Sequence, residues 1–394
     1  MAETSFPYLR KRAYLAATLT HFTVDVLNSS RTLVVALLAI SLGLTNQQVG
    51  IALIVYNLGA ALTQPLFGLL ADRYGPRWII IGGMGWMIFF YTLAATAGDW
   101  LALIAVTMAG LGSGAFHPAG TKVASQTPGT HRNQATALFF TIGQFGLFAG
   151  PVIAGILLDR FDRSGYIALP IMAILALLLD WSASFDKPER EPVKSVAEKK
   201  VAAAAARAAR PVSPWAALPV AIIVLCTNSF AISVSTYTPI LFAEQGYGQT
   251  YIGWAAGLVM LGSAIGVLVG GILADRWSAK WTVVVGVMLA FIPGYFYLPA
   301  GDPLRLPLLA LAGFLGGMPH SILVILMQSI LPKREGMATG LTLGFMFFAG
   351  SVGSLVVGRI ADSAGLETTL RSVPFILLAG ALAATFLPRF KHQR

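Results

Sequence analysis

Charged residues and cysteine are both scarce in this chain of 394 residues. Asp, Glu, Lys and Arg make up 11% of it, whereas about 25% is usual for a soluble protein. This shortage excludes an ordinary soluble enzyme and a disordered chain, since both need more polar surface. The single cysteine, Cys226, excludes a disulfide framework within the chain and a cysteine-based metal site.

The basic residues exceed the acidic ones and give a net charge of +10. Such an excess indicates a nucleic-acid partner only when the basic side chains gather on one folded face. Here they lie in short breaks between long apolar stretches, so we expect no nucleic acid to bind.

The apolar stretches are each long enough to form a membrane-spanning helix, which needs about 20 mostly apolar residues. They lie near 13–40, 48–71, 78–97, 101–121, 134–157, 167–185, 215–243, 250–274, 281–299, 305–330, 337–360 and 371–388. Because the stretches are continuous and do not alternate with polar residues, a transmembrane barrel is excluded. The sequence therefore predicts an all-α polytopic membrane protein with twelve transmembrane helices.

Most of the 27 Lys and Arg residues fall in alternate breaks between these spans. The positive-inside rule then places both termini in the cytoplasm. The first span is too long for a cleaved signal segment and is followed by further spans, so we expect it to remain.

The longest break, residues 186–213, separates an N-terminal six-span unit (1–185) from a C-terminal one (214–394). Residues 196–210 within it have high helix propensity. We expect a linker helix on the cytoplasmic membrane surface, with a regulatory docking site as the alternative.

The two units are copies of one another. The string GLLADRYGPR at 68–77 recurs as GILADRWSAK at 271–280, which is 203 residues later. The same offset relates Gly150 to Gly353, Gly155 to Gly358, Asp159 to Asp362 and His117 to His320. Parallel six-helix repeats with a site between them are the architecture of an alternating-access carrier. The sequence thus predicts two pseudo-symmetric six-helix bundles.

The loop at 68–77 closely resembles the signature loop of the major facilitator superfamily. The residues that carry the resemblance are Gly68, Asp72, Arg73, Gly75 and Arg77. The resemblance extends to the twelve spans, the division into two sets of six and the central loop. In that superfamily the Asp and Arg of this loop hold neighbouring helix ends together when the carrier is open outward, which implies a conformational latch here.

The second copy of the loop keeps the acidic and basic pair as Asp275 and Arg276. It has Ser278 in place of the glycine and Lys280 in place of the last arginine, so we expect a weaker latch there. A tight cytoplasmic turn with cations that reach the interface describes both copies as well.

The fifth span contains a glycine run that resembles the antiporter motif of the same superfamily. Its residues are Gly143, Gly146, Gly150, Pro151 and Gly155. The resemblance favours export over uptake. Small residues also let two helices approach closely, and such packing is the alternative role of this run.

Three polar residues share one face of the first span, where a charge is costly and therefore a functional candidate. Asp25 lies near the middle of the span, His21 four residues before it and Asn28 three after it. We expect His117, on the fourth span, at a depth similar to that of His21. A histidine near a carboxylate is suited to carrying a proton, so we assign Asp25, His21 and His117 to proton coupling. Interhelix hydrogen bonds are the alternative role of the histidines.

The repeat mates of these residues differ. Asp25 corresponds to Asn228, which cannot ionise, and His117 corresponds to His320. We therefore expect one half to titrate while the other does not, with His320 facing His117.

Arg31 lies about 9 Å beyond Asp25 along the first span. It can bind an anionic substrate, pair with a distant carboxylate or extend to the membrane surface. The other candidates for substrate binding are Asn28, Tyr56, Asn57, Gln64, Gln144, Asn228, Tyr237 and His320.

Three stretches are similar to one branch of the superfamily, the fosmidomycin-resistance-type efflux proteins. They are HFTVD at 21–25, QPLFG at 64–68 and GSGAFHP at 112–118. That branch has a similar His and Asp in its first helix and a Phe-His-Pro in its fourth. It typically has an acidic residue directly after that motif, where this chain has Ala119 and Gly120.

The resemblance implies a transporter for proton-coupled efflux of a small anionic or amphiphilic compound or drug by alternating access. We expect an integral protein of a bacterial inner membrane that acts as a monomer, with no enzymatic reaction, cofactor or metal. Its partners are then protons, a small-molecule substrate and the lipid bilayer. A lipid or lysolipid translocator and a solute importer of the same fold are the alternatives.

Overall fold

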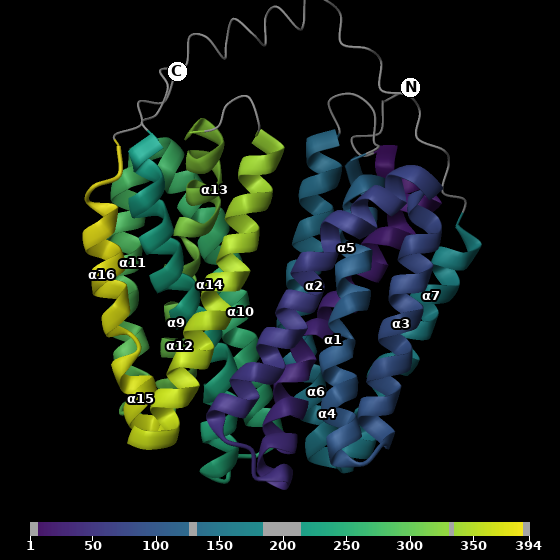
Figure 1. The fold of residues 1–394 in the computed structure, drawn as a ribbon, viewed down its shortest axis with the longest axis horizontal. Helices are drawn as coiled ribbons and strands as arrows, with labels where there is room; N and C mark the ends of the chain where they lie inside the picture. The colour runs from purple at the N-terminus through teal and green to yellow at the C-terminus, as the bar shows by residue number, and fades with distance from the viewer. Residues whose placement is uncertain (1–6, 126–131, 184–213, 331–334, 389–394) are drawn as a thin grey trace, which may run out of the picture.

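The computed structural model describes residues 7–125, 132–183, 214–330 and 335–388 (Figure 1). This part of the chain is almost entirely helical and contains no strand. The predicted linker helix at 196–210 lies outside the described residues. The all-α fold expected from the apolar stretches is confirmed.

In the described part of the N-terminal half, which lies on the right in Figure 1, the short 3-10 helix η1 (Pro7–Arg10) is followed by seven α-helices. They are α1 (Arg12–Leu42), α2 (Asn46–Tyr74), α3 (Pro76–Thr96), α4 (Asp99–Met108), α5 (Gly110–Ser125), α6 (Arg132–Gly165) and α7 (Ala168–Ser182). The helices α4 and α5 follow one another closely and together make one span, Asp99–Ala124.

The C-terminal half repeats this arrangement on the left of Figure 1. Its elements are α9 (Ala217–Glu244), α10 (Gln249–Leu273), η4 (Ala274–Ser278), α11 (Ala279–Phe296), α12 (Arg305–Gly317), α13 (Pro319–Ile330), α14 (Glu335–Ala364), α15 (Leu366–Ser372) and α16 (Phe375–Ala384). The pairs α12–α13 and α15–α16 each make one span.

Eleven helical segments of the described chain are long and apolar enough to cross a membrane. They coincide with eleven of the twelve predicted stretches to within a few residues at most ends. The remaining stretch, 167–185, corresponds to α7, which is apolar but has only 15 residues.

Within each half, one pair of helices packs very closely because the residues at the contact are glycines, which have no side chain. In the N-terminal half α6 packs on α1, and in the C-terminal half α14 packs on α9. A side-chain carbon at Gly150 would overlap Val26 of α1, and one at Gly353 would overlap Ser229 of α9. Gly150 and Gly353 are repeat mates, so the packing is duplicated as the sequence is.

The two halves meet mainly through α6 with α10 and α14 with α2, with α1 and α9 also in contact. The two halves meet at the end of the molecule where α1 joins α2 and α9 joins α10, which is at the bottom of Figure 1. We call this the closed end. At the opposite end the helices of the two halves diverge in Figure 1.

Candidate functional site

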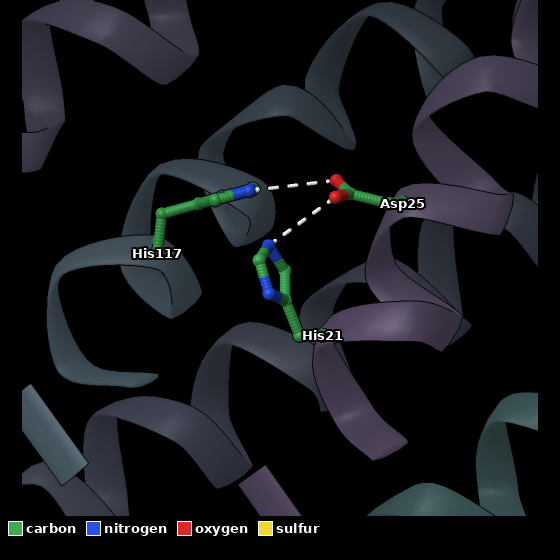
Figure 2. Close-up of side chains that lie close together, drawn as sticks. All are labelled: His21, Asp25 and His117. Carbon is green, nitrogen blue, oxygen red and sulfur yellow. Dashed lines mark ion pairs between the residues drawn. The ribbon is translucent and has the colours of Figure 1, made fainter. Parts of the chain in front are cut away.

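His21 and Asp25 of α1 and His117 of α5 come together within the N-terminal half, as Figure 2 shows for their side chains. The Nε2 atom of His21 lies 3.2 Å from Oδ2 of Asp25, one helical turn away on α1. The Nε2 atom of His117, on α5, lies 3.4 Å from Oδ1 of the same carboxylate. The common depth predicted for the two histidines is therefore observed, and one carboxylate contacts both rings. We call these three residues the triad.

The outer nitrogen of each ring fixes the ring's tautomer. Nδ1 of His21 lies 2.9 Å from the carbonyl oxygen of Phe139, and Nδ1 of His117 lies 2.8 Å from that of Ser113. Because a carbonyl oxygen only accepts hydrogen bonds, each Nδ1 must carry the hydrogen. In the neutral rings both Nε2 atoms then present lone pairs toward the Asp25 carboxylate.

Aromatic rings and a glycine hold the His21 ring in place. It stacks on Phe139 at a centroid distance of 4.1 Å and lies 5.7 Å from the ring of Phe116. On the α6 side, a side-chain carbon at Gly143 would lie 2.6 Å from His21 Nε2 and 2.8 Å from Asp25 Oδ2. The side chains of His21 and Asp25 are 3% and 8% exposed, whereas that of His117 is 27% exposed. His117 is therefore the least buried member of the triad.

Asn28 extends the triad along α1. Its Nδ2 donates to Oδ1 of Asp25 and to Oγ of Ser113, both at 3.0 Å. Its Oδ1 accepts a hydrogen bond from the hydroxyl of Tyr56 on α2. All the hydrogen-bonding groups of the buried amide are thus engaged except one lone pair, so Asn28 connects the triad to the next polar group.

Arg31 is that next group, and its guanidinium turns inward. Its Cζ lies 3.9 Å from the centre of the Tyr56 ring. It donates to the carbonyl oxygen of Asn28 and, at 3.2 Å, to Oδ1 of Asn57. Its Nε is buried without a hydrogen-bond partner. Among the described residues no carboxylate lies within 4.0 Å of the guanidinium. Two of the three roles expected for Arg31, pairing with a distant carboxylate and extension to the membrane surface, therefore do not describe this conformation.

Asn57 links this network to the other half of the molecule. Its Nδ2 donates to Oγ of Ser351 on α14 at 3.0 Å. A continuous series of polar contacts thus runs from the triad through Asn28, Tyr56 and Arg31 to the interface between the halves.

Asn228 and His320 line a separate cavity within the C-terminal half, with a volume of about 160 Å³. Apolar side chains such as Phe230, Val259 and Met346 form much of its wall. The polar groups in that wall are Thr227, Asn228, Ser235, Ser263 and His320. The cavity combines an apolar interior with a few hydrogen-bonding groups, which is typical of small-molecule sites.

The remaining candidates have different surroundings. Gln64 is half-buried and Gln144 is exposed, and neither makes a hydrogen bond to another described residue. Tyr237 is fully buried, and its hydroxyl lies 3.0 Å from the carbonyl oxygen of Asn46 and 2.8 Å from that of Ser354. Its hydroxyl thus lies at the interface between the halves.

Among the described residues, the partners of the proposed latch residues lie on neighbouring elements of the N-terminal half. Asp72 pairs with Lys122 of α5 at 2.6 Å, Arg73 lies over the ring of Tyr74, and Arg77 donates to the carbonyl oxygen of Trp181. All of these partners belong to the N-terminal half. Gly68 and Gly75 flank the pair, and the positive φ of Gly75, 88°, allows the chain to turn into α3.

In the second copy of the loop, Arg276 is exposed, and the side chain of Asp275 lies outside the described part. The latch therefore stays a prediction for both copies.

The glycine run of α6 serves two contacts. Gly146 and Gly150 face the backbone of α1, whereas Gly155 faces the backbone of Gln249 on α10 in the other half. The carbonyl oxygen of Pro151 faces Gly253 of α10. The run thus provides both the close helix packing and part of the interface between the halves.

Three polar residues with buried or charged partners were not predicted from the sequence. Ser113 contacts Asn28 and His117, and Lys122 pairs with Asp72. Asp180 on α7 is completely buried; its Oδ2 accepts from the hydroxyl of Thr20 at 2.7 Å, and its Oδ1 has no partner. An acidic residue in the apolar run before Trp181 was the available signal for Asp180.

The triad also has the geometry of a metal site. Its three ligand atoms lie within 4.8 Å of one another, and among the described His, Cys, Asp and Glu residues this is the group that does so. The sequence predicts no metal, because no ligand spacing is visible along the chain. His117 is far from His21 and Asp25 in sequence, and only the fold brings the three together.

Comparison with known proteins gives a consistent result. The family model described as Major Facilitator Superfamily matches residues 14–251 and 220–393. The fosmidomycin resistance protein of Escherichia coli (strain K12) is 27% identical over 406 residues, which cover 100% of this chain and 95% of that protein. The multidrug efflux pump Tap of Mycolicibacterium fortuitum is 26% identical over 317 residues, or 74% of this chain and 73% of that protein.

Among solved structures, a bacterial homologue of the human lysosomal transporter Spinster, in an inward-facing and occupied conformation, has the same fold. The TM-score is 0.79 at 14% sequence identity, with 98% of this chain and 99% of that chain covered.

Proposed function

Since the chain belongs to the major facilitator superfamily and is a transporter with efflux-type relatives, we propose that it exports a small anionic, amphiphilic compound in exchange for protons. The observation that carries this proposal is the triad, in which one carboxylate faces two histidine nitrogens at hydrogen-bond distance.

The triad needs protons to be stable. With both Nδ1 hydrogens committed to carbonyl oxygens, an ionised Asp25 beside two neutral rings has only lone pairs facing it. One added proton makes one of the two contacts attractive, and a second proton makes both attractive. A site that gains and loses one or two protons in a buried setting is suited to coupling. Nε2 of His21 and Oδ2 of Asp25 are 3.2 Å apart, which is a hydrogen-bond distance. A shared proton is therefore enough to join them, and no metal ion is needed.

The positive charge of Arg31 is the reason for proposing an anionic substrate. A guanidinium stays charged in proteins, and no described carboxylate neutralises this one. A substrate carboxylate, phosphate or phosphonate would supply the missing counter-charge, and Arg31 binds such groups in a fork geometry. The polar series from Arg31 through Asn28 to Asp25 gives a route by which substrate binding and protonation influence one another.

The apolar wall of the cavity at Asn228 and His320 is the reason for proposing that the same substrate has an apolar portion. Its volume of about 160 Å³ is close to that of a cavity that holds a benzene-sized group. The N-terminal half would then bind the charged group, while the C-terminal half accepts the apolar one.

The charge distribution along the chain supports an orientation with the closed end outside the cell. The basic breaks then face the cytoplasm, so the triad is loaded from the cytoplasmic side in this conformation. We place the protein as a monomer in a bacterial inner membrane.

The test is transport into proteoliposomes with an internal pH dye, with fosmidomycin as the first probe and other anions and lipophilic drugs after it. EDTA is present throughout to remove metal ions. Substrate-dependent proton movement is expected for the wild type and not for Asp25→Asn, which keeps the shape of the side chain but cannot ionise.

Asp180→Asn is the matched control, because it removes another buried carboxyl group that lies outside the triad. It should retain coupled transport. Full uphill transport by Asp25→Asn, or equal loss in both variants, contradicts the assignment of the proton site. Uptake in the opposite direction, or competition by lysolipids alone, would instead favour an importer or a lipid translocator.

A further inference from the structure

Two aspartates at the closed end each contact the first turn of a helix in the opposite half. Asp362, near the end of α14, accepts hydrogen bonds from the backbone N–H groups of Asn46 (2.7 Å) and Gln47 (3.0 Å) at the start of α2. Asp159, on α6, accepts from the backbone N–H of Gln249 (3.2 Å) and the hydroxyl of Thr250 (2.8 Å) at the start of α10.

These contacts are repeat mates throughout. Asp159 and Asp362 are 203 residues apart, as are Asn46 and Gln249. One turn before each aspartate lies a glycine, Gly155 or Gly358, and a side-chain carbon there would overlap the backbone of the opposite helix. The glycine permits the approach, and the carboxylate then reaches the first turn.

The carboxylates meet groups that have no other partner. The first N–H groups of a helix cannot bond within it and carry a partial positive charge. The residue before α10, Gly248, provides no side-chain cap. Thr45 caps α2 through Gln48, which leaves the N–H groups of Asn46 and Gln47 for Asp362. Each half thus caps a helix of the other.

We propose that Asp159 and Asp362 form a duplicated clasp that closes this end of the carrier and must open once in each transport cycle. These are positioning residues, since they set which end is open and need not touch substrate. The proposal goes beyond the coupled export described above and depends only on two halves that move relative to one another.

The two sides of the clasp are unequal. Asp362 accepts two backbone N–H groups, and the Tyr237 hydroxyl adds a contact with the carbonyl oxygen of Asn46 beside it. Asp159 has one backbone contact, and the position corresponding to Tyr237 is Val34. Loss of Asp362 should therefore open the closed end more than loss of Asp159.

The experiment measures distances between spin labels in the full-length protein in lipid nanodiscs, with Cys226 replaced by alanine. One pair of labels replaces Trp100 and Leu304, which are 60% and 58% exposed. Trp100 lies at the start of α4 and Leu304 directly before α12, both at the closed end. A second pair replaces the repeat mates Trp78 and Trp281 at the opposite end.

For Asp362→Ala we expect the population open at the closed end to rise by roughly fivefold, because an exposed charge-assisted hydrogen bond contributes modestly. The expected rise is smaller for Asp159→Ala and largest for the double variant. In each variant the distance at the closed end should lengthen while that at the opposite end shortens. Asp362→Asn, which keeps an acceptor but loses the charge, should lie between wild type and Asp362→Ala.

Asp99→Ala is the matched control. Asp99 is also at the closed end, but its ion pair is with Arg163 of the same half, so its loss should leave both distances unchanged. An unchanged distribution in the Asp159→Ala, Asp362→Ala double variant overturns the proposal. Equal changes in the Asp99→Ala control, or lengthening at both ends, also overturns it, since those results indicate general loosening.

Discussion

The N-terminal half holds His21, Asp25 and His117 in mutual contact, whereas the corresponding positions of the C-terminal half are Val224, Asn228 and His320. The backbone repeat is preserved in both halves. At these positions the second half has no ionisable carboxylate and one ring fewer, and Asn228 and His320 line an apolar-walled cavity instead. Under the proposed function, the duplicated scaffold divides its tasks: the N-terminal half handles protons and the C-terminal half accommodates an apolar group.

The largest expected effect comes from moving the carboxylate between the halves. In Asp25→Asn, Asn228→Asp the total charge is preserved, but the new carboxylate has Val224 where Asp25 has His21. We expect uphill transport to be abolished as in Asp25→Asn alone. Substrate accumulation against a gradient in proteoliposomes measures this, and recovery in the double variant would mean that the two halves are interchangeable.

Loss of the positive charge beside the triad is expected to have the next largest effect. Arg31→Gln should raise the KM for an anionic substrate roughly 10- to 100-fold, because a hydrogen bond to a charged group contributes about 1.5–3 kcal/mol. The KM of an uncharged analogue should change little. Initial rates for the two substrates provide the comparison, and an equal change for both would exclude an anion-specific role.

Close packing behind the triad gives a smaller effect. Gly143→Ala places a methyl group against His21 and Asp25, and overpacking costs about 1–3 kcal/mol. We expect coupled transport to fall roughly tenfold with the protein still folded. Gly344→Ala on α14 is the control because the space around Gly344 is open, and an equal loss there would contradict a local effect.

The smallest effect is expected at Asp180. An isolated buried carboxylate is costly, so with one hydroxyl partner Asp180 should be neutral, and Asp180→Asn should alter transport less than about twofold. The thermal unfolding midpoint and the transport rate of the variant test this. A loss as large as that of Asp25→Asn would mean that the proton pathway includes α7.

Some features of the site were predictable because they are local. His21 lies four residues before Asp25 and Asn28 three residues after it, so their common face follows from the helix period. The pairing with His117 required only that the first and fourth spans lie side by side. The partners of Arg31 and Tyr237 were not predictable, since these side chains bend toward groups on other helices whose rotation the sequence does not specify.

By itself the sequence determined the spans, the duplication and the family, because hydrophobic length and a repeated motif are properties of the chain alone. The tertiary structure decided which polar groups meet: the two rings on one carboxylate, the Arg31 guanidinium on Tyr56 and Asn57, and the aspartates that cap helices of the opposite half. These depend on the approach and rotation of helices, which many weak contacts set together.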